Sequence, residues 1–344
     1  MDIDIMTGAG RWVDVADRAR AVEAAGFSGM LFTETSATPW MSIAAAAMAA
    51  PTLTFTTGIA VAFPRSPMIS AAIAWELAEN TEGRFRLGLG SQVRAHIERR
   101  YGAEFDPPGP RMKDYVSAVK ACLRAFSGSE RLNHDGPYYQ LSLLPDAWSP
   151  RRHDYTDVKV DISAVGPYMT RAAGEVADGI HVHPFHSVAY LDEVLAPAVA
   201  EGAARVGRDP SEVDLIVPVF TIVGDSEEER APMRDVARAQ IAFYGSTRNY
   251  AFQFDMLGFE GTSAKLNERL KAGDLPGMAE LITDDMLEHY AVTASWSELG
   301  PKLVDRYGKR AARVVMYQAE ASIKADPDNL AKWASVAEAV RSTA

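Results

Sequence analysis

The sequence predicts a (β/α)8 barrel, also called a TIM barrel, with insertions after its fourth and seventh strands. Strand-like and helix-like patterns alternate from the first residue onward, which indicates parallel strands joined by helices. Eight strand-like segments occur in 344 residues, a length that suits one barrel domain over residues 1–344. A doubly wound open sheet is the main structural alternative.

The predicted strands are short and rich in β-branched residues, which favour extended backbone. They are Asp2–Met6, Met30–Glu34, Leu53–Val61, Phe85–Gly90, Val158–Val165, Gly179–His183, Leu215–Val223 and Arg313–Gln318. In the first helix, Trp12, Val15 and Ala19 recur at helical spacing, and Gly26 ends the run as glycine commonly does. Further helices are expected at Met41–Ala50, Pro67–Asn80, Arg111–Phe126 and Tyr168–Ala177.

Two regions exceed what a minimal barrel needs. Residues 128–157 are rich in Gly, Pro, Asn and aromatic residues, which predicts a hairpin-like insertion between strands four and five. Residues 230–307 read as a mostly helical insertion between strands seven and eight. In a barrel, both insertions would rise from the C-terminal face and wall the active site.

The segment Met41–Phe63 carries no charged residue and is long enough to suggest a transmembrane helix. Pro51 divides it, and the Thr-rich stretch Thr52–Thr57 follows. We therefore expect a buried helix followed by a buried strand, and no membrane span.

The overall charge and the cysteine content narrow the possible partners and compartments. The chain has 35 Lys and Arg against 46 Asp and Glu, a formal charge of −11, which argues against nucleic acid or an anionic membrane as the main partner. Its one cysteine, Cys122, excludes a disulfide framework and fits a reducing compartment. The N-terminus lacks the basic region of a secretory signal, so we expect a cytoplasmic protein.

The turn after the fifth predicted strand is a candidate anion site. Gly166 breaks the strand, and Pro167 follows at the helix position where its missing N–H costs nothing. The turn Ser163–Gly166 then lies at a helix N-terminus, where free backbone N–H groups and the positive end of the helix dipole attract anions.

The resemblance of this chain to a known family is strongest in three segments: Gly26–Glu34, Gly83–Gly102 and Ile162–Phe185. The chain resembles the luciferase-like oxidoreductase superfamily, and within it the branch that uses the deazaflavin coenzyme F420. Arg84–Gly90 resembles the family's Gly-Arg-x-x-Leu-Gly-x-Gly fourth strand, and Ala164–Pro167 resembles its fifth-strand turn. The resemblance runs from the first strand to the eighth. It implies a (β/α)8 barrel, a flavin-type cofactor on the C-terminal face and often a homodimer.

The resemblance also implies that the cofactor phosphate lies between the loops after strands four and five. The residues implied there are Gly90, Ser91, Gln92, Ala164, Val165, Gly166 and Pro167. Small residues let the backbone approach an anion closely, and Ser91 adds a hydroxyl donor. The alternative is tight helix–strand packing with no ligand.

The resemblance also implies contacts with the ring of the cofactor at two further positions. The family often has an Asp-His pair after strand two, whereas this chain has Glu34–Thr35, so the imidazole is lost. Glu34 either contacts the cofactor or forms a structural ion pair. Family members commonly have a non-proline cis peptide bond that backs the ring at the end of strand three, which predicts one between Ala60 and Val61 here; an ordinary buried strand is the alternative.

A general acid for protonating a reduced substrate is sought among His183, His96 and Glu34, in that order. His181 and His183 would point to one face of a strand, as a metal site requires. Because no Cys or other suitable ligand accompanies them, we expect no metal, and a structural role is the alternative for each histidine.

Two aromatic residues, Trp40 and Phe63, follow strands two and three and are predicted to line a substrate pocket. Glucose-6-phosphate dehydrogenases of the F420 branch have an acidic residue where this chain has Val93. No cationic cluster suited to a sugar phosphate is visible either, so that substrate is disfavoured.

These observations favour an F420-dependent oxidoreductase that transfers a hydride between the deazaflavin C5 and an unidentified small organic substrate. An FMN-dependent monooxygenase of the same superfamily is the first alternative. A non-catalytic protein that binds flavin or F420 is the second.

Overall fold

The computed structural model describes residues 1–342, which fold into two compact units. Unit 1 contains Met1–Ile5, Val182–Pro197 and the chain from Ile216 onward, and unit 2 contains Met6–His181 and Ala198–Leu215. Strands β1, β9 and β10 each contribute residues to both units.

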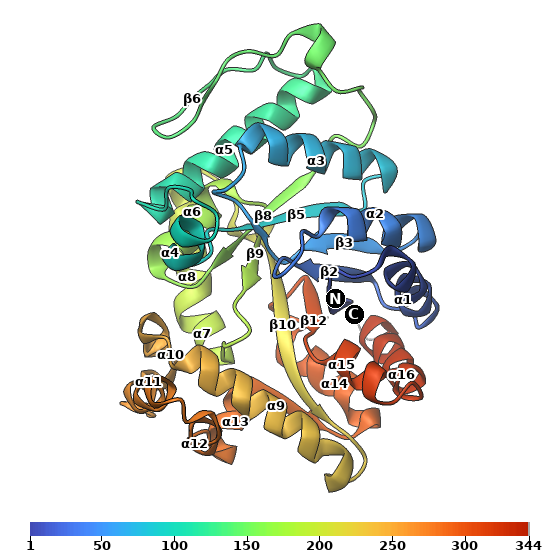
Figure 1. Cartoon of the computed structure of the whole chain (residues 1–344), viewed down its shortest axis with the longest axis vertical. Coiled ribbons are helices and arrows are strands. Elements are labelled where there is room, and N and C mark those ends of the chain that lie inside the picture. The colour runs from blue at the N-terminus through green and yellow to red at the C-terminus, as the bar shows by residue number, and fades with distance from the viewer. Residues whose placement is uncertain (343–344) are drawn as a thin grey trace. The chain divides into compact units, whose positions relative to one another are not determined.

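The main sheet closes into an eight-stranded barrel, which confirms the predicted fold class (Figure 1). Its strands pair in the order β10, β12, β1, β2, β3, β5, β8 and β9, and β9 pairs again with β10. The barrel strands are β1 (Asp2–Gly8), β2 (Gly29–Thr33), β3 (Thr54–Thr57), β5 (Phe85–Gly90), β8 (Lys159–Ala164), β9 (Gly179–Val182), β10 (Asp214–Val223) and β12 (Arg313–Met316). Neighbours such as β2 and β3, β5 and β8, and β1 and β12 run parallel, as strands joined by helices must.

In unit 2, helices cover the strands. They are α1 (Trp12–Ala24), α2 (Trp40–Ala49), α3 (Pro67–Asn80), α4 (Arg94–Arg99), α5 (Pro108–Ser127), α6 (Pro167–Val176) and most of α8 (Ala196–Arg205). The charge-free segment contains helix α2 followed by β3, as expected. No helix among residues 1–342 is both long enough and apolar enough to cross a membrane. Cys122 is free and buried on α5.

Between α5 and β8, a two-stranded antiparallel hairpin lies within residues 128–157. Its strands are β6 (His134–Asp135) and β7 (Gln140–Leu141), and a short 3-10 helix spans Asp146–Trp148. The buried carboxylate of Asp114 on α5 accepts hydrogen bonds from the backbone N–H groups of Tyr138 and Tyr139, at 2.8 and 2.9 Å. This side chain ties the hairpin to α5.

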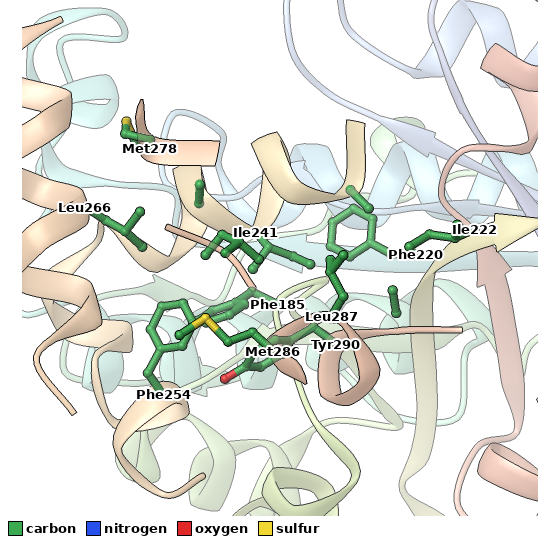
Figure 2. Close-up of a cluster of buried hydrophobic side chains, with 14 residues drawn as sticks. Phe185, Phe220, Ile222, Ile241, Phe254, Leu266, Met278, Met286, Leu287 and Tyr290 are labelled. Carbon is green, nitrogen blue, oxygen red and sulfur yellow. The ribbon is translucent and has the colours of Figure 1, made fainter. Parts of the chain in front are cut away.

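In unit 1, Phe185, strand β10 and several helices that follow it contribute to an apolar core, drawn in Figure 2. The helices of unit 1 are α7 (Val188–Tyr190), α9 (Glu227–Gly245), α10 (Phe252–Asp255), α11 (Thr262–Ala272), α12 (Leu275–Glu280), α13 (Asp284–Tyr290), α14 (Trp296–Tyr307), α15 (Ala319–Ala325) and α16 (Asn329–Ser342). Phe185, Phe220, Ile241, Phe254 and Tyr290 belong to this core.

One further strand, β11 (Ala291–Ala294), interrupts the region that the sequence predicts to be mostly helical. It pairs in parallel with the second half of β10, from Phe220 to Val223. Only four residues long, β11 shows no extended alternation of its own. Its strand conformation accompanies its pairing with the neighbouring β10 and not a pattern in its own sequence.

Candidate functional site

In unit 2, Glu34 follows strand β2 and lies in a buried ion pair with Arg65. Its Oε2 accepts hydrogen bonds from the backbone N–H of Val61 at 2.7 Å and from Nη1 of Arg65 at 2.8 Å. The same Arg65 nitrogen donates to the carbonyl of Val61 at 2.7 Å. Because these donors engage the carboxylate as an acceptor, the geometry favours an orienting role for Glu34 over proton donation.

Trp40, the first residue of α2, lies beside this ion pair. The Arg65 guanidinium carbon is 5.5 Å from the Trp40 ring centroid. The indole Nε1 is buried and has no hydrogen-bond partner among residues 1–342. An unpaired buried N–H is costly, so this group is suited to donate to a bound ligand.

The structure thus brings together Glu34, Trp40 and Val61 around Arg65, which sequence reasoning did not select. Arg65 is the first charged residue after the charge-free segment that begins at Met41. This position could have identified Arg65 from the sequence, because a cation that is buried beside a charge-free segment needs an anionic partner. Phe63 is buried and packs edge-on against Phe105, with ring centroids 6.2 Å apart.

The predicted cis peptide bond between Ala60 and Val61 is wrong: the non-proline cis bond joins Gly58 and Ile59. Ala60 and Val61 instead form the short strand β4, whose residues pair with Leu89 and Gly90 of β5. At position 58, a Cβ atom would lie 2.2–2.6 Å from atoms of the Leu31 side chain, so only glycine fits. The cis bond therefore follows the glycine, and Ala60 and Val61 beyond it are buried.

Strands β5 and β8 end close together, at the residues that sequence analysis assigns to the phosphate. A Cβ atom on Gly90 would approach the Ser163 hydroxyl to 2.8 Å and the Ile59 side chain to 2.4 Å. Two residues later, Gln92 has a φ of +56°, which is uncommon for a residue with a side chain. Such conformations concentrate at ligand sites.

Helix α6 begins at Pro167, as predicted, and Gly166 is its N-cap residue. No side chain caps this helix N-terminus, and a Cβ atom at Gly166 would have no neighbour within 4 Å. The first-turn N–H groups of a helix have no intrahelical partner and carry the positive end of its dipole. The turn combines open space with backbone donors, although Ala164 itself is buried.

The histidines separate into distinct surroundings. His96 lies exposed on helix α4. In unit 2, His181 is buried with its Nε2 3.8 Å from the Asp161 carboxylate. In unit 1, Nδ1 of His186 lies 2.9 Å from the His183 carbonyl oxygen, and its Nε2 is 3.3 Å from the Tyr307 hydroxyl. Among residues 1–342, no group of three His, Cys, Asp or Glu side chains is arranged to hold a metal ion.

His183, immediately after β9, is surrounded by tyrosine rings in unit 1. Its ring centroid is 4.7 Å from that of Tyr244 and 4.7 Å from that of Tyr250. The Tyr244 hydroxyl is 2.8 Å from that of Tyr317, which follows strand β12. Burial lowers the pKa of His183 to about 4, so the imidazole is neutral at pH 7. Sequence reasoning did not select Tyr250 or Tyr317, because their proximity to His183 depends on folding of distant segments.

Sequence comparison finds relatives along most of the chain. Residues 2–313 match the family described as luciferase-like monooxygenase. An uncharacterised protein of Mycobacterium tuberculosis is 37% identical over 291 residues, which cover 85% of this chain and 86% of the relative. A 5,10-methylenetetrahydromethanopterin reductase of Methanolobus tindarius is 26% identical over 287 residues, 81% of this chain and 82% of the relative.

Comparison of structures gives the same fold. The F420-dependent tetrahydromethanopterin reductase of Methanopyrus kandleri superposes with a TM-score of 0.79 over 99% of each chain, at 18% sequence identity. The likeness covers the barrel and both insertions.

Proposed function

Because this chain belongs to the luciferase-like monooxygenase family, whose members related to it include F420-dependent reductases and dehydrogenases, we propose that it is an F420-dependent oxidoreductase. It transfers a hydride between the deazaflavin C5 and a small organic substrate. The observation that carries the proposal is the uncapped N-terminus of α6 beside the small-residue ends of β5 and β8.

The turn residues fit a phosphorylated cofactor. Gly166 leaves open space in front of the α6 N-terminus, and Gly90 allows the β5 backbone to come close to β8. Ser91 supplies a hydroxyl, and Gln92 holds the loop in its left-handed conformation. Together these groups would bind a phosphate through backbone N–H groups, which suits a chain with a net charge of −11.

The Glu34–Arg65 pair and Trp40 would bind the polar edge of the ring system. Glu34 and Arg65 fix each other and the backbone at Val61. The Trp40 N–H is a buried donor that lacks a protein partner within residues 1–342. Preorganised groups of this kind orient a cofactor without reorganising when it binds.

When bound, the deazaflavin supplies the hydride chemistry, and the protein supplies position and electrostatics. Burial lowers the pKa of His181 and of His183 to about 4, and that of His186 to about 3. At pH 7 these imidazoles are neutral and scarcely act as proton donors. A proton that the substrate requires would then come from solvent or from a group other than these three imidazoles.

Titration of the purified protein with F420 and, separately, with FMN tests this proposal through quenching of tryptophan fluorescence. We expect micromolar or tighter binding of F420 and at least about tenfold weaker binding of FMN, a difference of 1.4 kcal/mol. Preference for FMN would place the protein among the oxygenases of its family. Binding of neither would contradict the proposal.

A further inference from the structure

The residues around His183 form a set that the proposed cofactor site does not use. We call His183, Tyr244, Tyr250 and Tyr317 the His183 aromatic set. The rings of Tyr244 and Tyr250 contact the imidazole at interplanar angles of 82° and 53°. Tyr317 extends the set through its hydroxyl contact with Tyr244 and packs on Phe220, with ring centroids 4.8 Å apart.

The hydrogen bond at Nδ1 fixes the tautomer of His183. The backbone N–H of Phe185 donates to Nδ1 at 3.1 Å, so Nδ1 is an acceptor. In a neutral imidazole, one nitrogen accepts and the other carries the hydrogen. Nε2 of His183 is therefore an N–H donor. Within residues 1–342, Nε2 of His183 has no hydrogen-bond partner. This nitrogen is not fully buried, in contrast to the buried polar atoms that lack a partner.

The surroundings of His183 are uncharged. Burial lowers its pKa to about 4, and no charged side chain contributes to that shift. Burial also raises the pKa of Tyr244, Tyr250 and Tyr317, so each remains a neutral phenol. In the Tyr244–Tyr317 pair one hydroxyl donates to the other, and the accepting hydroxyl keeps its own hydrogen for another partner.

We propose that Nε2–H of His183 donates a hydrogen bond to the oxygen of an uncharged substrate, and that the His183 aromatic set selects a ketone or secondary alcohol over a phosphorylated or carboxylated compound. This inference rests on the proposed oxidoreductase function. Flat apolar rings pack against the carbon skeleton, and the imidazole N–H orients the oxygen. A phosphate or carboxylate would lose its hydration here without gaining a cation.

Two matched variants separate the two imidazole nitrogens. H183Q places an amide N–H near the position of Nε2, whereas H183N places it near Nδ1. On the F420-loaded protein, ligand-observed NMR with a panel of uncharged ketones and secondary alcohols, cyclohexanone included, should show binding within about threefold of wild type for H183Q. H183N should bind at least about tenfold more weakly, as expected for loss of a buried hydrogen bond. Glucose 6-phosphate serves as the charged probe and should bind more weakly than the best uncharged probe.

Nitrogen-15 spectra of the histidine rings, recorded without cofactor, test the tautomer independently. We expect His183 as the neutral Nε2–H form from pH 5.5 to 8, assigned by its loss in H183N. An Nδ1–H form, an imidazolium at pH 7 or equal probe binding by H183N and wild type would overturn the inference, as would failure of every uncharged probe to bind. Failure of F420 itself to bind would instead overturn the proposed function, while the ring spectra still report on His183.

Discussion

The turn before α6 in unit 2 and the His183 aromatic set of unit 1 are two contrasting kinds of candidate binding surface. The turn presents backbone N–H groups, small residues and open space, with the paired charges of Glu34 and Arg65 in the same unit. The aromatic set presents neutral side chains that crowd around one imidazole. The first suits an anion that the backbone can bind, and the second suits an uncharged molecule that side chains enclose.

The largest expected effect, on the free energy of unfolding, comes from removing the charge of Arg65. This change breaks the Glu34–Arg65 ion pair of unit 2. R65M leaves the Glu34 carboxylate buried without its cation, because the Glu34 side chain is 3% exposed. We expect the free energy of unfolding to fall by about 3–5 kcal/mol, measured by urea denaturation. The double variant E34L/R65M removes both charges and should be more stable than R65M; equal stability of the two variants would contradict this interpretation.

A second test uses pH to examine whether the imidazole of the His183 aromatic set is neutral in the folded protein. The pKa of His183 is about 4 in the folded protein and near the ordinary 6.5 when unfolded. Between these values the unfolded chain binds more protons, so stability is greatest above pH 6.5 and falls as the pH drops toward 4. H183Q removes this contribution, about 2 kcal/mol at pH 5, and should show a smaller drop in Tm between pH 7 and pH 5 than wild type. An unchanged drop would mean that the imidazole is not buried as neutral.

A charge placed at the turn tests whether that region binds an anion. G166D puts a carboxylate where the phosphate is expected, and G166N has the same shape without the charge. Both side chains cap helices well, and the φ of −79° at Gly166 accepts either. We expect G166D to bind F420 at least about tenfold more weakly than G166N, in fluorescence titrations at low salt. Equal affinity would assign the turn to packing alone.

The smallest effect is expected from the Ser91 hydroxyl. S91A removes one neutral donor from the loop after β5 and should weaken F420 binding by about 1 kcal/mol, roughly fivefold. S91T keeps the hydroxyl and provides the control in the same titration. Loss of binding in S91T but not in S91A would show that space, not hydrogen bonding, matters at this position.

The barrel could be predicted from sequence because each strand and helix carries its own local pattern. The start of α6 at Pro167 is an example, since proline at a first helical position and the preceding glycine are local signals. Properties that arise between distant segments were missed or misplaced. The contact of His183 with Tyr250, the pairing of β11 with β10 and the clash of Leu31 with any side chain at position 58 all depend on residues far apart in sequence.

The sequence marks the candidate site only in part, for the same reason. Glycines, Ser91 and the helix start mark the turn before α6 by residue type alone. Arg65 is marked only by its place after the charge-free segment, and its pairing with Glu34 becomes evident in the fold. The tautomer of His183 has no mark in the sequence, because it depends on the backbone N–H of Phe185.

The sharing of β1, β9 and β10 between the two units has a practical consequence for dissecting the protein. Unit 1 is assembled from three separate stretches of chain and unit 2 from two. No single cut, by a protease or by a stop codon, can therefore release either unit whole. Three boundaries fall inside β1, β9 and β10 and the fourth inside helix α8, so deletion series will remove parts of both units at once. Point substitutions are the means to assign a role to each unit.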